Sequence, residues 1–141
     1  MSKLCSLGIH GSFLKWCQDF LNDRHQAVKI KNFVSSLIPV TSGVPQGRHL
    51  SPIFFNSYIN DLRHYIACTF CAFADDLKMY RIVNCLNDTV ELQHDLDELV
   101  QWCKDNHLSL NIDKCKIITF TRKHNPIQCT YTVDSATLER V

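Results

Sequence analysis

The sequence predicts an α+β fold in which antiparallel strands form a sheet and helices pack on one face of it. The chain has 141 residues, 45% of them hydrophobic, which suits one domain with a single core. Some segments repeat apolar residues at helical spacing, whereas others alternate apolar and polar residues or cluster β-branched ones. The strand-like segments follow each other closely in pairs, which is typical of hairpins rather than of parallel βαβ units.

Charge and cysteine content narrow the class of protein. The net charge is +1, from 15 Lys and Arg against 14 Asp and Glu, so a nucleic acid would be bound through a local patch. No apolar run reaches about 18 residues, and the N-terminus lacks the pattern of a signal peptide. We therefore expect an intracellular protein, nuclear or cytoplasmic, that is not secreted and contacts no membrane. Its eight cysteines show no paired spacing and are expected to be free, buried thiols.

The first elements predicted are helices followed by a hairpin. Ser12 caps a helix that closes at Asn22. Alternation over 26–31 and the apolar run 34–41 predict two strands that turn at Asn32.

A loop rich in glycine and proline follows over 42–47, and Ser51 and Pro52 open the next helix as its cap and first-turn proline. That helix carries a wide apolar face, which we expect to be buried: Ile53, Phe54, Phe55, Tyr58, Ile59 and Leu62.

Two carboxylates interrupt the next predicted hairpin, which spans 67–83 with Asp75 and Asp76 between its strands. The remaining predicted elements are a helix over 88–106, capped by Asn87 and Asp88, and strands over 116–121 and 130–133.

Asp75 and Asp76 are the residues that most clearly suggest chemistry. Neighbouring side chains on an extended backbone point to opposite sides, so one carboxylate would ligate an ion directly and the other would support it. An apolar strand leads to the pair, and the 42–47 loop lets backbone approach a ligand closely. This combination suits a phosphate-bearing substrate held through Mg²⁺. An ordinary polar turn is the alternative, because aspartate is favoured in turns.

Blocks of residues along nearly the whole chain resemble the reverse transcriptases of non-LTR retrotransposons. In order, they are Ser42-Gly43-Val44-Pro45-Gln46-Gly47 with Leu50-Ser51-Pro52, Phe55-Asn56 with Tyr58-Ile59-Asn60-Asp61-Leu62, Phe73-Ala74-Asp75-Asp76, and Leu108-Ser109-Leu110-Asn111-Ile112-Asp113-Lys114-Cys115-Lys116. Each block is weak by itself, but their order and spacing together are specific.

This resemblance implies a palm subdomain, incomplete at both ends, within a partial reverse transcriptase domain over 1–141. It implies RNA-directed DNA polymerase activity, in which two metal ions support nucleotide transfer onto a primer 3′-hydroxyl. The implied cofactor is Mg²⁺, and the implied partners are an RNA template, a DNA primer and deoxynucleotides.

The resemblance also implies residue roles. Asp75 matches the carboxylate that ligates both metals, Asp76 its supporting acid, and Phe73 the aromatic residue near the primer end. Lys114, in the Asn-Lys block over 108–121, matches a lysine that stabilises or protonates the leaving pyrophosphate. The loop that borders the incoming nucleotide and the templating base is matched by Gly43, Pro45, Gln46 and Gly47.

The sequence departs from the family's pattern. The first metal-binding block, an Asp followed by a Phe-Asp pair, is not found, and neither are the fingers, the primer-gripping block and the thumb. Asp19 and Asp23 are expected to be solvated or capping residues that do not replace it. Arg48 and His49 stand where the family has small or apolar residues, and Arg48 would either meet a phosphate or reflect drift in a decayed copy.

We therefore expect the isolated chain to be inactive as a polymerase. One alternative is a non-catalytic remnant that binds nucleic acid or protein, and another is a translated fragment of a decayed element. The strand that the family places beside the Asp75-Asp76 hairpin is not found either. We therefore expect an exposed edge near Phe70, Ala72 and Phe73, and self-association through it.

Other motifs are not interpreted as sites. Cys68 and Cys71 form a lone C-x-x-C without a second pair for zinc. Asp95-Leu96-Asp97 is expected to be a solvated helix face. Arg122, Lys123 and His124 are expected to be a solvated strand end.

Overall fold

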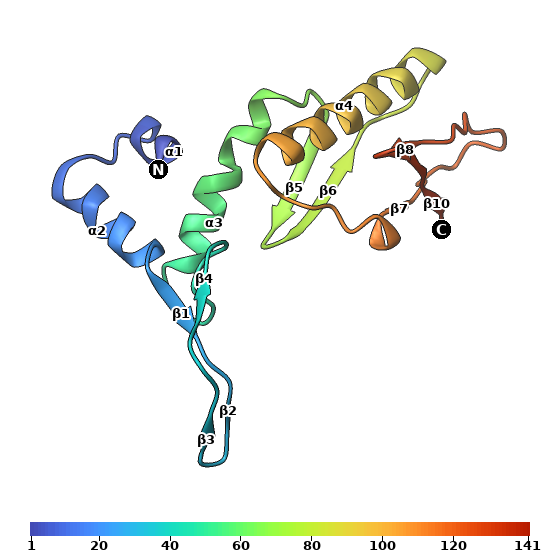
Figure 1. Ribbon diagram of the computed structural model, residues 1–141. Helices are drawn as coiled ribbons and strands as arrows, with labels where there is room; N and C mark the ends of the chain where they lie inside the picture. Colours follow the sequence, from blue (N-terminus) through green and yellow to red (C-terminus); the bar gives the residue numbers. More distant parts are fainter. The chain divides into compact units, whose positions relative to one another are not determined.

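The computed structural model describes all residues 1–141, which form two compact units, residues 1–60 and 61–141 (Figure 1). The first unit contains α1 (Ser2–Ser6), α2 (Gly11–Leu21), β1 (Arg24–Gln26), β2 (Lys29–Ile30), β3 (Phe33–Val34), β4 (Ile38–Val40) and α3 (Ser51–Ile59). The second contains β5 (Thr69–Phe73), β6 (Asp76–Tyr80), α4 (Leu86–Asp105), β7 (Lys116–Ile117), β8 (Thr132–Val133), β9 (Ala136–Thr137) and β10 (Glu139–Arg140). Short 3₁₀ helices, η1 (Asn60–His64) and η2 (Ile112–Lys114), complete the structure.

The strands of the first unit form one long, interrupted hairpin. β1 pairs antiparallel with β4, and β2 pairs with β3. Between these ladders the backbone N–H of Ser35 donates to Val28 O at 2.9 Å, and Val28 N–H donates to the Ser35 hydroxyl at 3.0 Å. Lys31 takes a left-handed φ of 54° beside Asn32, where the chain reverses. The predicted hairpin and its turn are confirmed, although its strands are shorter than expected.

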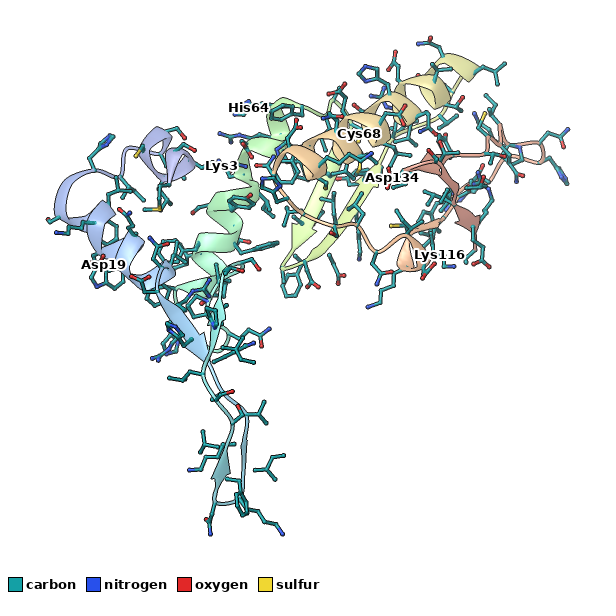
Figure 2. The ribbon with its side chains drawn as sticks, in the orientation of Figure 1. Lys3, Asp19, His64, Cys68, Lys116 and Asp134 are labelled. Atoms are coloured by element: carbon teal, nitrogen blue, oxygen red, sulfur yellow. The ribbon has the colours of Figure 1, made fainter.

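A row of aromatic rings joins α2 to α3 within this unit. Phe13 stacks on Trp16 and Trp16 on Phe20, each with ring centroids 5.7 Å apart, and Phe20 meets Phe54 at 5.5 Å. Cys17 is fully buried. At the other end of α3, the Lys3 ammonium donates to the carbonyl of Tyr58 at 2.8 Å (Lys3 is labelled in Figure 2). These contacts hold the three helices together with little buried apolar area.

The apolar face predicted on α3 is only partly covered, since Phe54, Phe55 and Ile59 are half-buried and Tyr58 is exposed. Ile53 is 59% exposed, and only Leu62, which follows in η1, is buried. The prediction that this whole face is buried is therefore wrong.

Three predicted caps are also wrong. Helix α2 begins after His10 rather than Ser12, and Ser51 is the first residue of α3, whose cap is Leu50. Asn87 lies within α4, whose cap is Cys85.

Helix α4 organises the second unit. Its buried side chains Leu99, Trp102 and Cys103 belong to the same core as Tyr131 and Val133. The Gln93 side chain accepts the backbone N–H of Thr132 and donates to the carbonyl of Thr132, both at 2.9 Å. These two bonds pair the backbone N–H and carbonyl of Thr132 in β8, as a neighbouring strand would.

Both ends of α4 agree with the sequence to within about two residues. The Asp88 carboxylate accepts the backbone N–H groups of Cys85 and Asn84 at 2.9 and 2.7 Å, and these bonds lower the pKa of Asp88. Near the other end, the Lys104 ammonium pairs with Asp134, labelled in Figure 2, at 2.7 Å. Charged side chains thus stabilise each terminus.

The fold class is mixed helix and strand, as predicted, but the strands do not form one layered sheet. They make five separate two-stranded ladders, of which β7–β10 is parallel and the rest are antiparallel. The strand predicted over 116–121 is paired only at Lys116 and Ile117, and that over 130–133 only at Thr132 and Val133. Helix side chains such as Gln93 occupy hydrogen-bonding positions that a wider sheet would fill with strands. None of the helices combines the length and the apolar character needed to span a lipid bilayer.

We predict that Leu99→Ala lowers the free energy of unfolding by about 2–5 kcal/mol, because Leu99 is only 6% exposed and its loss leaves a cavity in the α4 core. The matched control is Val90→Ala on the same helix, where a side chain 65% exposed should change stability by less than about 0.5 kcal/mol. Urea denaturation followed by circular dichroism measures both. Equal effects of the two substitutions would contradict the assignment of this core.

Candidate active site

The adjacent carboxylates lie at the tip of the β5–β6 hairpin. The strands pair in a register that sets Phe73 opposite Asp76, so Ala74 and Asp75 form the connection between them. Ala74 adopts a left-handed φ of 52°, which costs an alanine about 1–2 kcal/mol relative to the right-handed region. The structure therefore has the expected hairpin between 67 and 83, with paired strands from Thr69 to Tyr80.

The pairing also assigns residues to the two faces of the hairpin. Directly opposed residues share a face, and residues two apart along a strand share it too. Asp76, Phe73 and Lys78 therefore lie on one face, where all three are exposed, Phe73 to 81%. The opposite face carries the half-buried residues, namely Phe70, Leu77 and Met79.

Asp75 and Asp76 fit part of a divalent metal site. Both are exposed, and carboxylate oxygens are ligands that hard cations such as Mg²⁺ prefer. Nowhere in the chain do three His, Cys, Asp or Glu side chains gather as possible ligands. The hairpin tip thus offers one adjacent pair of oxygen donors beside an exposed aromatic ring.

The loop over 42–47 belongs to the first unit, and side chains hold the backbone of its first four residues. The Arg24 guanidinium donates to the carbonyls of Ser42 and Gly43 at 3.0 and 2.6 Å, and the Ser51 hydroxyl donates to the carbonyl of Pro45. Gly43 and Gly47 have φ values of 70° and 72°, while a Cβ at either position would meet nothing within 4 Å. Backbone conformation, rather than lack of space, therefore favours glycine at both positions.

The remaining residues singled out in the sequence are exposed. Lys114 ends the η2 turn in the same unit as the hairpin. Arg48 and His49 are exposed beside the loop, and Asp19 and Asp23 are exposed as expected (Figure 2 labels Asp19 on α2). The structure thus brings Phe73, Asp75 and Asp76 together, whereas Pro45, Gln46 and the loop glycines belong to the other unit.

Comparison with known proteins identifies the family. The profile of the family described as "Reverse transcriptase (RNA-dependent DNA polymerase)" matches residues 1–134. The chain belongs to this reverse transcriptase family. Enzymes of the family generally use divalent metal ions and bind a nucleic-acid template and primer.

Curated relatives of this reverse transcriptase chain come from insect mobile elements. The chain is 28% identical over 115 residues to the RNA-directed DNA polymerase from mobile element jockey of Drosophila melanogaster. It is 30% identical over 115 residues to the probable RNA-directed DNA polymerase from transposon BS of the same species. Each match covers 75% of this chain but only 13% of the relative, so the chain spans a small part of their length. No solved structure matches it.

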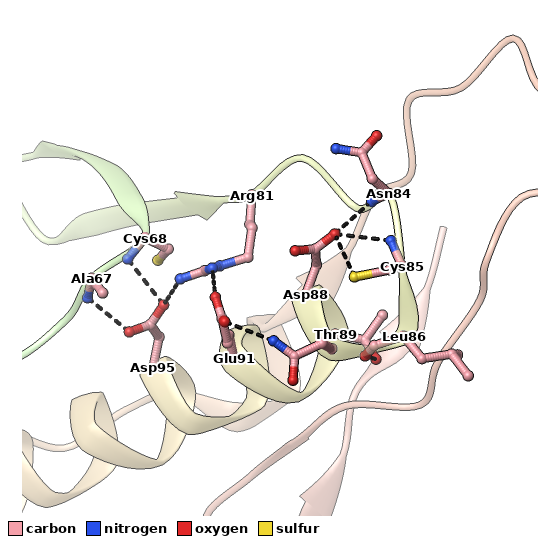
Figure 3. A network of polar contacts seen from close by, with 11 residues as sticks. Ala67, Cys68, Arg81, Asn84, Cys85, Leu86, Asp88, Thr89, Glu91 and Asp95 are labelled. Atoms are coloured by element: carbon pink, nitrogen blue, oxygen red, sulfur yellow. Dashed lines mark hydrogen bonds and ion pairs between the residues drawn. The ribbon is translucent and has the colours of Figure 1, made fainter.

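One residue of this reverse transcriptase chain that the sequence interpretation missed is Asp95 on α4. It was expected on a solvated face, but it is only 2% exposed, and that expectation is wrong. Figure 3 shows its carboxylate accepting the backbone N–H groups of Ala67 and Cys68, at 2.7 and 2.9 Å, and pairing with the Arg81 guanidinium at 3.0 Å. Its spacing from Leu99 and Trp102, four and seven residues on, is a sequence signal that could have placed it on the buried stripe.

The surroundings of Asp95 and of its neighbour Cys68 shift the pKa values of both groups. Burial raises the pKa of Asp95, but the hydrogen bonds from Ala67, Arg81 and Cys68 outweigh it, and the pKa lies below its ordinary value. For Cys68, burial together with the neighbouring Asp95 charge raises the pKa to about 11. All eight cysteines are free, as expected, but only Cys17, Cys68 and Cys103 are buried.

We predict that acid destabilises the second unit through Asp95. Because its pKa is lower in the folded than in the unfolded chain, its stabilisation is complete above the ordinary pKa of about 3.9 and is lost as the pH falls through the depressed value. Urea denaturation from pH 7 to about pH 2 should show this loss, and the pH dependence should be weaker in Asp95→Asn. NMR titration of the wild-type carboxyl group provides a check that does not require the variant to fold. An Asp95 pKa at or above the ordinary value would contradict the prediction.

Proposed function

We propose that this chain is part of an RNA-directed DNA polymerase of a non-LTR retrotransposon, and that the β5–β6 tip carries ligands of its catalytic metal ions. The observation that supports this most is the exposed Asp75–Asp76 pair on a hairpin turn, within a chain that matches the reverse transcriptase family over residues 1–134. The curated relatives, which are described as RNA-directed DNA polymerases, agree with it.

In the proposed palm subdomain, the chain's own residues bind and orient the reactants. Asp75 is the direct ligand of the metal ions, for which we propose Mg²⁺, and Asp76 is the supporting acid. Phe73, on the same hairpin face as Asp76, provides an apolar surface for the primer end. When bound, the ions would activate the primer 3′-hydroxyl and stabilise the leaving phosphates. Lys114 would place a positive charge, or a proton, on the departing pyrophosphate.

The glycine-proline loop is proposed to border the incoming nucleotide and the templating base. The bonds from Arg24 and Ser51 hold its backbone at Ser42, Gly43 and Pro45, while Gln46 and Gly47, which follow, are exposed. This arrangement would keep the loop's backbone in place and leave Gln46 accessible to a ligand.

Charge in the first unit supports contact with a polyanion. From Arg24 to Asn60 the sequence contains no Asp or Glu, but it contains Arg24, Lys29, Lys31 and Arg48. Lys29 and Lys31 are exposed at the tip of the first hairpin, and Arg48 follows the loop. We propose that this stretch meets the phosphates of template or primer, so that binding depends on a local patch and falls with rising salt.

We predict that Mn²⁺, used as a probe for Mg²⁺, binds the full chain at the hairpin tip. Backbone NMR signals of Ala74 to Asp76 should broaden at substoichiometric Mn²⁺, because a paramagnetic ion relaxes nearby nuclei. Asp75→Asn should remove most of this broadening, whereas Asp97→Asn, which changes the net charge equally at an exposed site on α4, should leave it intact.

The alternative is a non-catalytic remnant that binds nucleic acid. The wild-type chain and Asp75→Asn also distinguish this alternative from the proposed metal role. If an RNA–DNA duplex binds equally well to wild type and Asp75→Asn while Mn²⁺ leaves the tip signals unchanged, the metal role is wrong and the binding role stands. That the isolated chain extends no primer stays a prediction, which a primer-extension assay on an RNA template checks.

The β5–β6 ladder also supports a proposal about self-association. It is a two-stranded sheet whose outer edges pair with no other strand, and exposed edges of this kind attract further strands. We propose that a second copy of the chain pairs there. Sedimentation velocity should show dimers or larger species increasing with concentration, and Cys71→Lys on β5 should suppress them, since lysine protects sheet edges.

Phe33→Lys is the matched control for this experiment. Phe33 is 82% exposed at the tip of the other hairpin, so its replacement removes apolar surface without touching the β5–β6 edge. A monomer at all concentrations, or suppression by Phe33→Lys alone, would overturn the proposal.

A further inference from the structure

The open end of the β5–β6 hairpin is fastened to α4 by one carboxylate. Ala67 and Cys68 directly precede β5, and Arg81 directly follows β6. Asp95 accepts a hydrogen bond from each of these residues, so it binds the chain both where it enters and where it leaves the hairpin (Figure 3).

Arg81 provides a second point of attachment on the same helix. Its guanidinium pairs with Glu91, one turn before Asp95, as well as with Asp95 itself. Glu91 in turn accepts a hydrogen bond from the Asn87 side-chain amide at 2.8 Å. Because a guanidinium is planar, contacts to two carboxylates on successive turns fix the direction of the hairpin as well as its distance from the helix.

Apolar packing contributes little to holding the hairpin. None of the side chains in β5 or β6 is buried, and only Phe70, Leu77 and Met79 are half-buried. In contrast, Asp95 is 2% exposed and Cys68 is 7% exposed. The buried contacts of the hairpin are therefore concentrated at its base, around the Asp95 carboxylate.

The length of the hairpin amplifies any movement at this base. The five residues of each strand place the tip about 17 Å from the base, at about 3.3 Å per residue. A tilt of about 10° at the base would therefore displace Asp75 and Asp76 together by about 3 Å relative to α4.

We propose that Asp95 is a positioning residue that, through Ala67, Cys68 and Arg81, sets the orientation of the hairpin and thereby the placement of Asp75 and Asp76. It touches no metal ligand, and it acts from the opposite end of the hairpin. The functional consequence rests on the proposed role of Asp75 and Asp76 as metal ligands, but the orientation itself does not.

The test compares Asp95→Asn with two control variants in the full chain, free of metal and nucleic acid. An asparagine keeps the shape but loses the charge and one acceptor oxygen. Asp97→Asn makes the same charge change at an exposed position, and Leu99→Ala destabilises the same helix without removing a hydrogen bond to the hairpin base. Residual dipolar couplings measured by NMR report the orientation of β5–β6 relative to α4.

With Asp95→Asn we expect the hairpin couplings to change relative to those of α4 while β5 and β6 remain paired. We expect both controls to keep the wild-type orientation wherever they are folded. If Asp95→Asn does not fold, Arg81→Lys provides the test, because an ammonium lacks the rigid planar fork that pairs with Glu91 and Asp95 in a fixed direction, and it should change the orientation in the same way. A wild-type orientation in these variants, or an equal change in Leu99→Ala, would overturn the proposal.

A second measurement links orientation to the metal ligands. Because Asp75 and Asp76 move together with the hairpin, Asp95→Asn should keep Mn²⁺ at the tip but change the paramagnetic broadening that this ion causes in the backbone signals of α4. Asp97→Asn and Leu99→Ala should keep the wild-type pattern of broadening. If wild type binds no Mn²⁺, the proposed metal role fails while the dipolar couplings still decide the positioning role. If the couplings change and the broadening of the α4 signals does not, the functional part of the inference is wrong.

Discussion

The second unit depends most on the hydrogen bonds and the ion pair that the Asp95 carboxylate makes. A buried charge is tolerated only when it is paired and hydrogen-bonded, and Asp95 meets both conditions through two backbone N–H groups and Arg81. These partners come from either side of one hairpin, so the need to satisfy a single charge also fixes the strands. Gln93, two residues earlier on α4, binds β8 through the same kind of side-chain contact to backbone. Helix α4 thus holds two hairpins through polar groups where a larger sheet would use neighbouring strands.

Side chains fasten part of each candidate segment and leave the rest accessible. Arg24 and Ser51 bind the carbonyls of Ser42, Gly43 and Pro45, and Asp95 binds the base of the β5–β6 hairpin. Gln46 and Gly47, which follow the fastened carbonyls, are exposed, and so are Asp75 and Asp76 at the hairpin tip. Such residues can meet a large polyanionic ligand without a pocket, because the ligand itself would supply the opposite wall of the site.

Membership in the reverse transcriptase family and the chemistry of this chain rest on different observations. Membership follows from the match over residues 1–134, whereas the metal role rests on two carboxylates at a turn and is proposed from their geometry. Since the chain spans about 13% of its curated relatives, their activity comes to this chain only as a proposal. The local features on which that proposal rests are an exposed acidic turn and an acid-free basic stretch.

The sequence by itself determined the features that depend on neighbouring residues. The hairpin around Asp75 and Asp76, the bounds of α4 and the glycines of the 42–47 loop follow from alternation, capping and backbone conformation, which are local properties. Tertiary structure decided the features that depend on distant partners. Asp95 resembles a solvated acid in the sequence, but Ala67, 28 residues earlier, donates a hydrogen bond to it. Ser51 resembles a cap, but its hydroxyl donates a hydrogen bond to the carbonyl of Pro45. The separation of the strands into five ladders was likewise undetermined by local pattern, because an alternating sequence specifies a strand but not which strand pairs with it.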